Sequence, residues 1–332
     1  EFKNKYDLTA FVTDLLINCA FSSNDEKLQK SIFDLSAIFN DDLQDSFIMS
    51  CCSIDSFNFN QRLYNRSFKT MSGLANMGCT CYMNSILQQL SANNKVIASF
   101  AQSTQQLRPD IQQLLELFIN QRFGLRNYYS TSSYCEAYSK FNTEFRTHEQ
   151  EDAVEFFNML LEACPAETKQ LFEGKLKHTL SRGEIDVQSQ ILSERQEIFT
   201  TVDVSVAGIP DLSTSLRHFL APERLTKDNA YVTESGEEVE AFKYTRFSTL
   251  PRFLVFHLKR FEYNLSNYTR YKINSSFEFP TTLNMSEFSD EGNLYRLKGA
   301  VIHMGVAEGG HYVSVVRRER KWILCDDSSL SE

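Results

Sequence analysis

The chain has few of the residues that interrupt helices and strands, and it lacks the cysteine pairs that bind structural metals. Its 332 residues include 12 glycines, 6 prolines and one tryptophan, and residues 1–70 contain neither glycine nor proline. None of the eight cysteines belongs to a Cys-x-x-Cys pair, and their spacing is too irregular for a disulfide framework. We therefore expect reduced thiols, no metal, no cofactor and a cytosolic or nuclear location.

Long apolar runs and an excess of positive charge are also missing. No stretch approaches the ~18 apolar residues that span a bilayer, and the N-terminus does not have the pattern of a signal peptide. The net charge of −9 argues against nucleic acid or an anionic membrane as the partner and favours a basic one. Because the chain begins Glu1-Phe2-Lys3 without a methionine, we expect it to be part of a longer polypeptide.

Apolar residues at helical spacing dominate the first half of the chain. Residues 1–70 form a predicted N-terminal helical extension. Three further helices are predicted within 71–170: one from Cys81, one around Ile111–Phe118 and one over Ala153–Leu161 that ends before Pro165.

The second half of the chain is typical of strands. Residues 175–250 are mixed and strand-rich, and residues 253–259 read as a nearly fully buried strand. Further strands are predicted over 297–303, 311–317 and 321–325. Because the helices come first and the strands later, the expected fold class is α+β.

Cys81 is the candidate nucleophile. It follows a glycine-containing turn and Thr80, a suitable N-cap, at the predicted start of a helix. The positive end of the helix dipole should lower the pKa of a thiol in this position. His311 and the pair Asp326-Asp327 stand far downstream, and cysteine, histidine and a carboxylate are together the parts of a cysteine protease.

The register of the last two strands decides which carboxylate meets the histidine. If Arg318-Glu319 is a two-residue turn, Arg317 faces Arg320 and His311 lies opposite Asp326. Arg-Glu is a poor pair for such a turn, and a longer loop would shift the register so that Asp327 could orient the imidazole.

Four blocks of the chain, in order, resemble the catalytic domain of the ubiquitin-specific protease family of deubiquitinases. The first is a cysteine box over residues 73–85, and the second resembles the glutamine-aspartate box over residues 149–157. The third is a central strand segment over residues 255–261 with residues 272–274 and 277–280 after it. The fourth is a histidine box made of Gly309-Gly310-His311-Tyr312, Trp322 and Asp326-Asp327.

The resemblance implies a papain-like cysteine protease over residues 71–332, after the helical extension over 1–70. A helical thumb would cover about 71–170, fingers about 171–250, and an antiparallel palm about 251–332. Cys81 would attack the carbonyl at the ubiquitin C-terminus, His311 would be the general base and then the acid, and Asp326 would orient it. Asn76 and the backbone N–H of Cys81 would donate to the oxyanion.

The resemblance also implies a surface for the ubiquitin tail. Asp152 and Glu155 would pair with its arginines. The further binding residues expected on this basis are Gln150, His257, Phe261, Gly310, Tyr312 and Asp327.

The sequence departs from the family in two places. Cys79 stands where the family usually has asparagine; it is either an innocuous small residue or a second, redox-sensitive thiol. The cysteine pairs that hold zinc in the fingers of many members are missing, so we expect fingers held by packing alone.

The expected partners are ubiquitin and ubiquitinated proteins. Two alternatives remain open: the same chemistry on another ubiquitin-like modifier, and a catalytically inactive ubiquitin-binding module.

Overall fold

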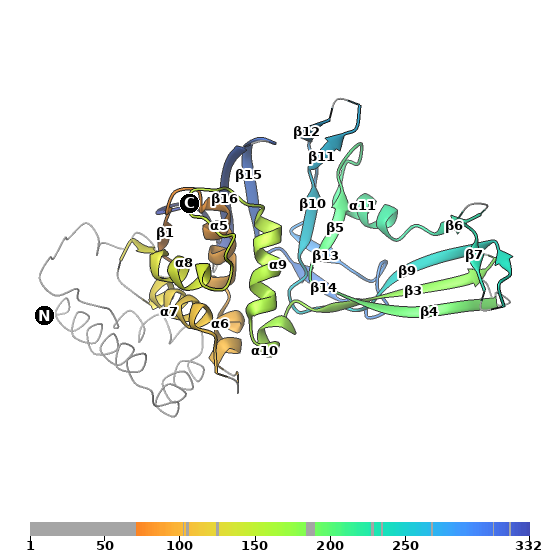
Figure 1. The fold of residues 1–332 in the computed structure, drawn as a ribbon, viewed down its shortest axis with the longest axis horizontal. Helices are drawn as coiled ribbons and strands as arrows, with labels where there is room; N and C mark the ends of the chain where they lie inside the picture. The colour runs from red at the N-terminus through yellow and green to blue at the C-terminus, as the bar shows by residue number, and fades with distance from the viewer. Residues whose placement is uncertain are drawn as a thin grey trace, which may run out of the picture. The chain divides into compact units, whose positions relative to one another are not determined.

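The computed structural model describes residues 71–332 apart from 102, 104–105, 124–125, 184–189, 227–228, 234, 267, 308 and 319. The described chain forms two compact units (Figure 1). Unit 1 comprises residues 71–168, 298–305 and 309–332, and unit 2 comprises residues 169–297 and 306–308. The predicted extension over 1–70 lies outside the described residues.

Unit 1 combines helices with a four-stranded sheet. Its helices are α5 (Cys81–Ser91), α6 (Asn94–Ala101), α7 (Pro109–Phe123), α8 (Ser132–Ser139) and α9 (Ala153–Ala163), with the single turn α10 (Ala166–Lys169) at the junction with unit 2. The sheet has the order β15 (Gly299–Val306), β16 (Gly309–Arg318), β17 (Lys321–Asp326) and β18 (Ser329–Ser331). A short parallel pair is formed by β1 (Gly73–Ala75) and β2 (Tyr128–Ser130).

Helix α5 is the core element of unit 1. Ten of its eleven residues are buried, so it has no polar outer face. The ring of Tyr82 meets that of Phe156 on α9 edge-on, with 5.7 Å between centroids. Gln89, the one partly exposed residue, donates from Nε2 to Ser314 Oγ at 2.7 Å and to the Val315 carbonyl at 3.0 Å. The helix is thereby fixed to α9 and to β16.

Unit 2 is mostly antiparallel sheet. Its largest sheet has the order β4 (Gln190–Phe199), β3 (Gly174–Arg182), β9 (Ala241–Thr249) and β6 (Glu223–Leu225). Two-stranded pairs are formed by β5 (Val202–Ser205) with β10 (Phe256–Lys259), β7 (Tyr231–Val232) with β8 (Glu238–Val239), β11 (Phe261–Asn264) with β12 (Thr269–Lys272), and β13 (Thr282–Asn284) with β14 (Leu294–Arg296). Its one described helix is α11 (Leu212–Phe219), capped by the Asp211 carboxylate.

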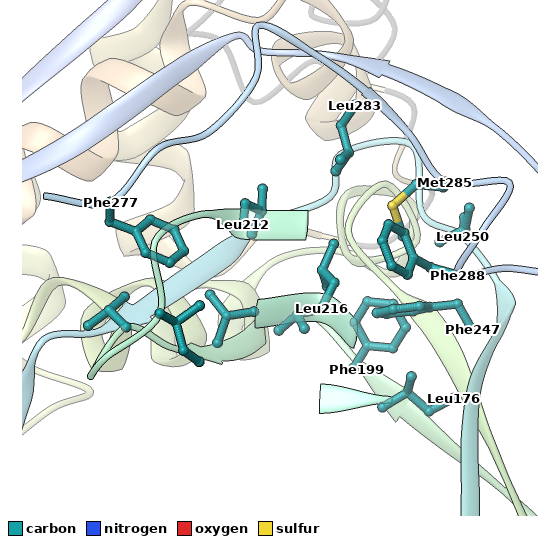
Figure 2. Packing of buried hydrophobic residues seen from close by; sticks show 14 residues of the cluster. Leu176, Phe199, Leu212, Leu216, Phe247, Leu250, Phe277, Leu283, Met285 and Phe288 are labelled. Carbon is teal, nitrogen blue, oxygen red and sulfur yellow. The ribbon is translucent and has the colours of Figure 1, made fainter. Parts of the chain in front are cut away.

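One apolar cluster holds unit 2 together, as Figure 2 shows. Phe247 is fully buried and packs against Phe199 and Phe219, with ring centroids 5.4 and 6.1 Å apart. Leu216 brings α11 into the same cluster, and Met285 and Phe288 close it from the segment after β13.

The α+β class predicted from the sequence is confirmed, and the three helices predicted within 71–170 correspond to α5, α7 and α9. The expectation of a nearly fully buried strand over 253–259 is wrong. The strand there covers only Phe256–Lys259, and its side chains are half-buried or exposed. No described helix is long and apolar enough to cross a membrane. The thumb, fingers and palm boundaries stay predictions.

Replacing Phe247 with alanine should lower the free energy of unfolding of unit 2 by about 3–5 kcal/mol, because the change leaves a cavity in the cluster. Urea unfolding followed by far-UV circular dichroism measures it. Ile198→Ala is the matched control, since Ile198 is 63% exposed, and it should change stability by less than about 0.5 kcal/mol. Equal losses in the two variants would contradict the assignment of this core.

Candidate active site

Cys81 is the first residue of α5, and the loop before it is built around the Asn76 side chain. The Asn76 Oδ1 accepts from the backbone N–H groups of Gly78 and Thr80, at 3.0 and 3.1 Å. Thr80 stands at the N-cap position, but its side chain makes no capping hydrogen bond. Asn76 therefore satisfies backbone donors at the start of the helix.

Glycine is required at position 78 of this loop. Its φ is +134°, which side chains disfavour, and a Cβ would lie 2.7 Å from the Thr147 carbonyl oxygen. That same carbonyl accepts from the Cys79 N–H at 2.6 Å. The close approach ties the cysteine loop to the segment that leads into α9.

The Cys81 sulfur lies in a buried position beside β16. Its Sγ accepts from the Tyr312 N–H at 3.5 Å and from Gln150 Nε2 at 3.8 Å. Tyr312 directly follows His311, so the structure brings the cysteine and histidine boxes together. His311 itself is hydrogen-bonded to a carboxylate.

His311 and Asp326 form that hydrogen bond. The Nε2 atom of His311 lies 2.6 Å from Asp326 Oδ1. Because a carboxylate only accepts, Nε2 carries the proton, which leaves the Nδ1 lone pair for a proton from the thiol. The imidazole and the carboxylate are partly exposed, at 36% and 49% of their side-chain surfaces.

The register predicted for the last two strands is wrong, although the pairing of His311 with Asp326 is found. The turn lies one residue further along the chain, so Arg318 pairs with Lys321 and Arg317 with Trp322. The ladder ends at Ser314 opposite Cys325, and continuing it would place Asp326 opposite Val313. His311 thus reaches Asp326 diagonally, a distance that a long side chain can bridge.

The expected lowering of the Cys81 pKa is also wrong for this state. Burial raises the pKa of the Cys81 thiol, and the negative charge of Asp327 raises it further. The N–H groups of Tyr312, Tyr82 and Cys81 act in the opposite direction but do not outweigh burial. Burial is a tertiary property, which a motif at the start of a helix does not reveal.

Asp327 links the strand turn to the cysteine loop. Its Oδ2 accepts from Asn76 Nδ2 at 2.8 Å, and its Oδ1 accepts from Asn84 Nδ2 at 2.7 Å. Its backbone carbonyl accepts from the Leu74 N–H at 2.8 Å, and its φ of +47° is uncommon for a residue other than glycine. Asp327 is therefore placed to hold Asn76 rather than to orient His311.

The Asn76 carboxamide has only one orientation that satisfies these contacts. Its oxygen faces two backbone N–H groups, so its NH2 group must face the carboxylate of Asp327. One N–H of that NH2 group bonds Asp327, and the NH2 group has a second N–H to donate.

The N-terminus of α9 carries the predicted tail-binding carboxylates. Asp152 is its N-cap, and its Oδ1 accepts from the N–H groups of Val154 and Glu155. Glu155 is exposed. Burial, with a smaller effect of Asp152, raises the pKa of Tyr312 to about 12, so this phenol stays protonated near neutral pH.

Gln150 bridges to β16. Its Oε1 accepts from the Gly310 N–H at 3.2 Å, and its Nε2 donates to the Gly310 carbonyl at 3.1 Å. Gly310 has no room for a side chain, because a Cβ would collide with the Met304 carbonyl and the His303 ring. Of the predicted residues, Gln150 and Tyr312 thus contact the Cys81 sulfur, and Gly310 contacts Gln150.

His257 and Phe261, the remaining predicted binding residues, belong to unit 2. His257 lies on β10, and its Nδ1 is 2.8 Å from Asp203 Oδ1 on the parallel strand β5. Phe261 begins β11 and pairs with Lys272. Their roles in binding stay predictions.

Sequence reasoning missed Asn84 and Asp203. Asn84 is a buried amide three residues after Cys81, and a buried polar side chain signals a specific partner. Asp203 has no comparable signal, because it is found only through the pairing of β5 with β10.

One group in the described part of the chain has metal-ligand geometry. The ligand atoms of His311, Asp326 and Asp327 lie within 4.8 Å of one another. Each of these side chains already has a hydrogen-bond role in the site, and a coordinating metal would compete with the His311–Asp326 bond.

The chain is similar to a known protein family and to several of its members. Residues 72–332 match the model of the ubiquitin carboxyl-terminal hydrolase family. The chain is 26% identical over 297 residues to ubiquitin carboxyl-terminal hydrolase 34 of Homo sapiens, covering 78% of this chain and 8% of that protein. It is 31% identical over 288 residues to ubiquitin carboxyl-terminal hydrolase 26 of Arabidopsis thaliana, covering 80% and 26%.

A fission-yeast relative gives the same result. The chain is 30% identical over 279 residues to ubiquitin carboxyl-terminal hydrolase 15 of Schizosaccharomyces pombe, covering 78% of this chain and 24% of that protein. The chain belongs to the ubiquitin carboxyl-terminal hydrolase family, as the resemblance predicted. It spans between 8% and 26% of the length of these relatives.

Replacing Asp327 with asparagine should lower the pKa of Cys81, because it removes a negative charge that disfavours the thiolate. The rate of alkylation by iodoacetamide should then rise at lower pH than in the parent protein. A Cys79→Ser background leaves one thiol in the peptide that is followed by mass spectrometry. Glu162→Gln, at an exposed position on α9, is the charge-matched control and should not move the profile. An unchanged or upward-shifted midpoint for Asp327→Asn would contradict this account.

Proposed function

We propose that this chain is a thiol-dependent deubiquitinase that cleaves the peptide or isopeptide bond after the C-terminal glycine of ubiquitin. One observation carries the proposal. The Cys81 sulfur meets the backbone of Tyr312, directly beside a histidine whose Nε2 is bonded to Asp326. Membership of the ubiquitin carboxyl-terminal hydrolase family supplies the substrate class.

The proposed chemistry begins with His311. Its Nδ1 takes the proton of Cys81, and the sulfur attacks the carbonyl carbon of the terminal glycine. For this step Nδ1 must come within hydrogen-bond reach of the thiol, an approach that substrate binding completes. The resulting imidazolium is stabilised by the Asp326 carboxylate.

The oxyanion forms beside Asn76. The second N–H of its NH2 group and the backbone N–H of Cys81 are the proposed donors. His311 then returns the proton to the leaving amine, which departs and leaves a thioester on Cys81. Water, deprotonated by His311, hydrolyses the thioester and frees the ubiquitin carboxylate.

The same proposal covers the architecture and location. A papain-like arrangement of thumb, fingers and palm is supported by the family match and by the α+β content. A cytosolic or nuclear location is proposed because no two of the five described cysteines form a disulfide with each other. Ubiquitinated proteins are the proposed partners, and the activity of the longer protein is part of the same proposal.

The decisive experiment uses ubiquitin that carries a thiol-reactive group at its C-terminus. The parent protein should form a covalent adduct, and Cys81→Ala should form none, because the attacking sulfur is gone. Cys79→Ser is the matched control and should keep the adduct. Parallel reactions with other ubiquitin-like modifiers test the alternative specificity. Binding of ubiquitin without any adduct would indicate an inactive binding module.

Replacing Asp152 with asparagine separates tail binding from helix capping. Asparagine caps a helix about as well as aspartate, so the melting temperature should hold. The lost charge should raise KM for a fluorogenic ubiquitin substrate by roughly twofold to tenfold, if the carboxylate pairs with a tail arginine. Asp152→Ala should add a loss of stability of about 1 kcal/mol. An unchanged KM in Asp152→Asn would remove this residue from the binding surface.

A further inference from the structure

Strand β16 continues past the end of its partner strand β17. Their pairing stops at Ser314, yet β16 runs back to Gly309. Backbone groups alternate in direction along a strand, so those of Tyr312 and Gly310 point to the same side as those of Ser314. At these two residues β17 no longer covers that edge of β16.

Side chains of unit 1 form hydrogen bonds with these uncovered backbone groups of β16. The Tyr312 N–H points at the Cys81 sulfur, 3.5 Å away. The Gly310 N–H and carbonyl are both bonded to the Gln150 carboxamide, at 3.2 and 3.1 Å. A carboxamide that exchanges two hydrogen bonds with one residue reproduces the contact of a directly opposed residue in an antiparallel strand. The same Nε2 lies 3.8 Å from the nucleophile.

We propose that the Gln150 carboxamide is an internal stand-in for a peptide group of the substrate. In the resting enzyme it occupies the Gly310 edge of β16, and the extended C-terminal tail of the modifier displaces it to pair with that edge. Gln150 is thus a positioning residue that closes the approach to Cys81 until a tail arrives. The inference rests on the proposed function, since the displacing group is the tail of a ubiquitin-like modifier.

The chemistry of the edge suits a bare backbone. Gly310 leaves no side chain between the strand and its partner, and the Met304 carbonyl and His303 ring exclude even a Cβ. A tail that ends in glycine can approach such a strand closely without a clash.

The contact is also weak enough to be displaced. Gln150 and Gly310 are both exposed, so water can replace either hydrogen bond when the carboxamide moves away. Gln150 precedes the α9 N-cap by two residues, so its side chain can leave the edge without unwinding the helix. The cost of opening is then a rotation of one side chain.

Steady-state kinetics on a fluorogenic ubiquitin substrate test the stand-in. In Gln150→Ala the tail no longer competes with the carboxamide, so KM should fall by about twofold to fivefold, the equivalent of one net hydrogen bond between exposed groups. Gln112→Ala, at an exposed position on α7, is the matched control and should leave KM unchanged. If Gln150 only stabilised the site, its loss would raise KM or lower kcat.

Amide hydrogen exchange at Gly310 gives an independent readout. The free Gln150→Ala variant should exchange this amide faster than the parent protein. In the covalent ubiquitin adducts both proteins should protect it equally, because the tail then supplies the acceptor. Faster exchange that persists in the variant's adduct would overturn the proposal. If the parent protein processes ubiquitin but Gln150→Ala shows an unchanged or raised KM, only the proposed role of Gln150 is wrong. If the parent protein is inert toward every modifier, the proposed function is wrong as well.

Discussion

The burial of α5 on all sides is the constraint on which the site depends. A helix with one apolar face can rotate or slide to some extent, but α5 meets α9 through Tyr82 and the sheet through Gln89. With ten of eleven residues buried, a rotation would open cavities on several sides at once. The position of Cys81 at its first turn is thus set by the packing of the whole unit. The cost of that packing is a buried thiol with a raised pKa.

Carboxamides, rather than charges, set the geometry around the thiol. Asn76 and Asn84 both hold Asp327, and Gln150 holds Gly310. Each carboxamide offers a donor and an acceptor in fixed directions without adding charge beside the sulfur. Asp327 shows the effect of a full charge there, since it raises the Cys81 pKa. Neutral amides can therefore fix the loop without raising the pKa of the thiol as Asp327 does.

The sequence predicted the structure correctly where the pattern of residues is local or repeats along the chain. Periodicity predicted α5, α7 and α9, because apolar residues recur at helical spacing in each of these segments. The strand register was missed because Arg-Glu has no strong turn preference, so nothing local distinguishes a turn at 318–319 from one a residue later. The partners Asn84 of Asp327 and Asp203 of His257 depend on contacts between distant segments. The pKa of Cys81 was missed for the same reason, because burial is a property of the folded unit.

The sequence of unit 2 lacks the cysteine pairs that hold zinc in many family members, so its sheet must be stabilised by other contacts. Its apolar cluster gathers at Phe247 and Leu216. Of the ten residues of β4, only Phe199 is buried and belongs to this cluster, whereas the nine residues from Gln190 to Ile198 are exposed or half-buried. Outside the cluster, the strand ladders are accompanied by exposed ion pairs such as Lys177–Glu194 and Arg224–Glu240. Exposed ion pairs of this kind contribute little, typically ~0–1 kcal/mol each. We therefore expect the outer part of β4, which has no residue in the cluster, to open locally at lower cost than the base of the sheet. A sheet held in this way can adjust its shape to a bound partner while the cluster keeps its base fixed.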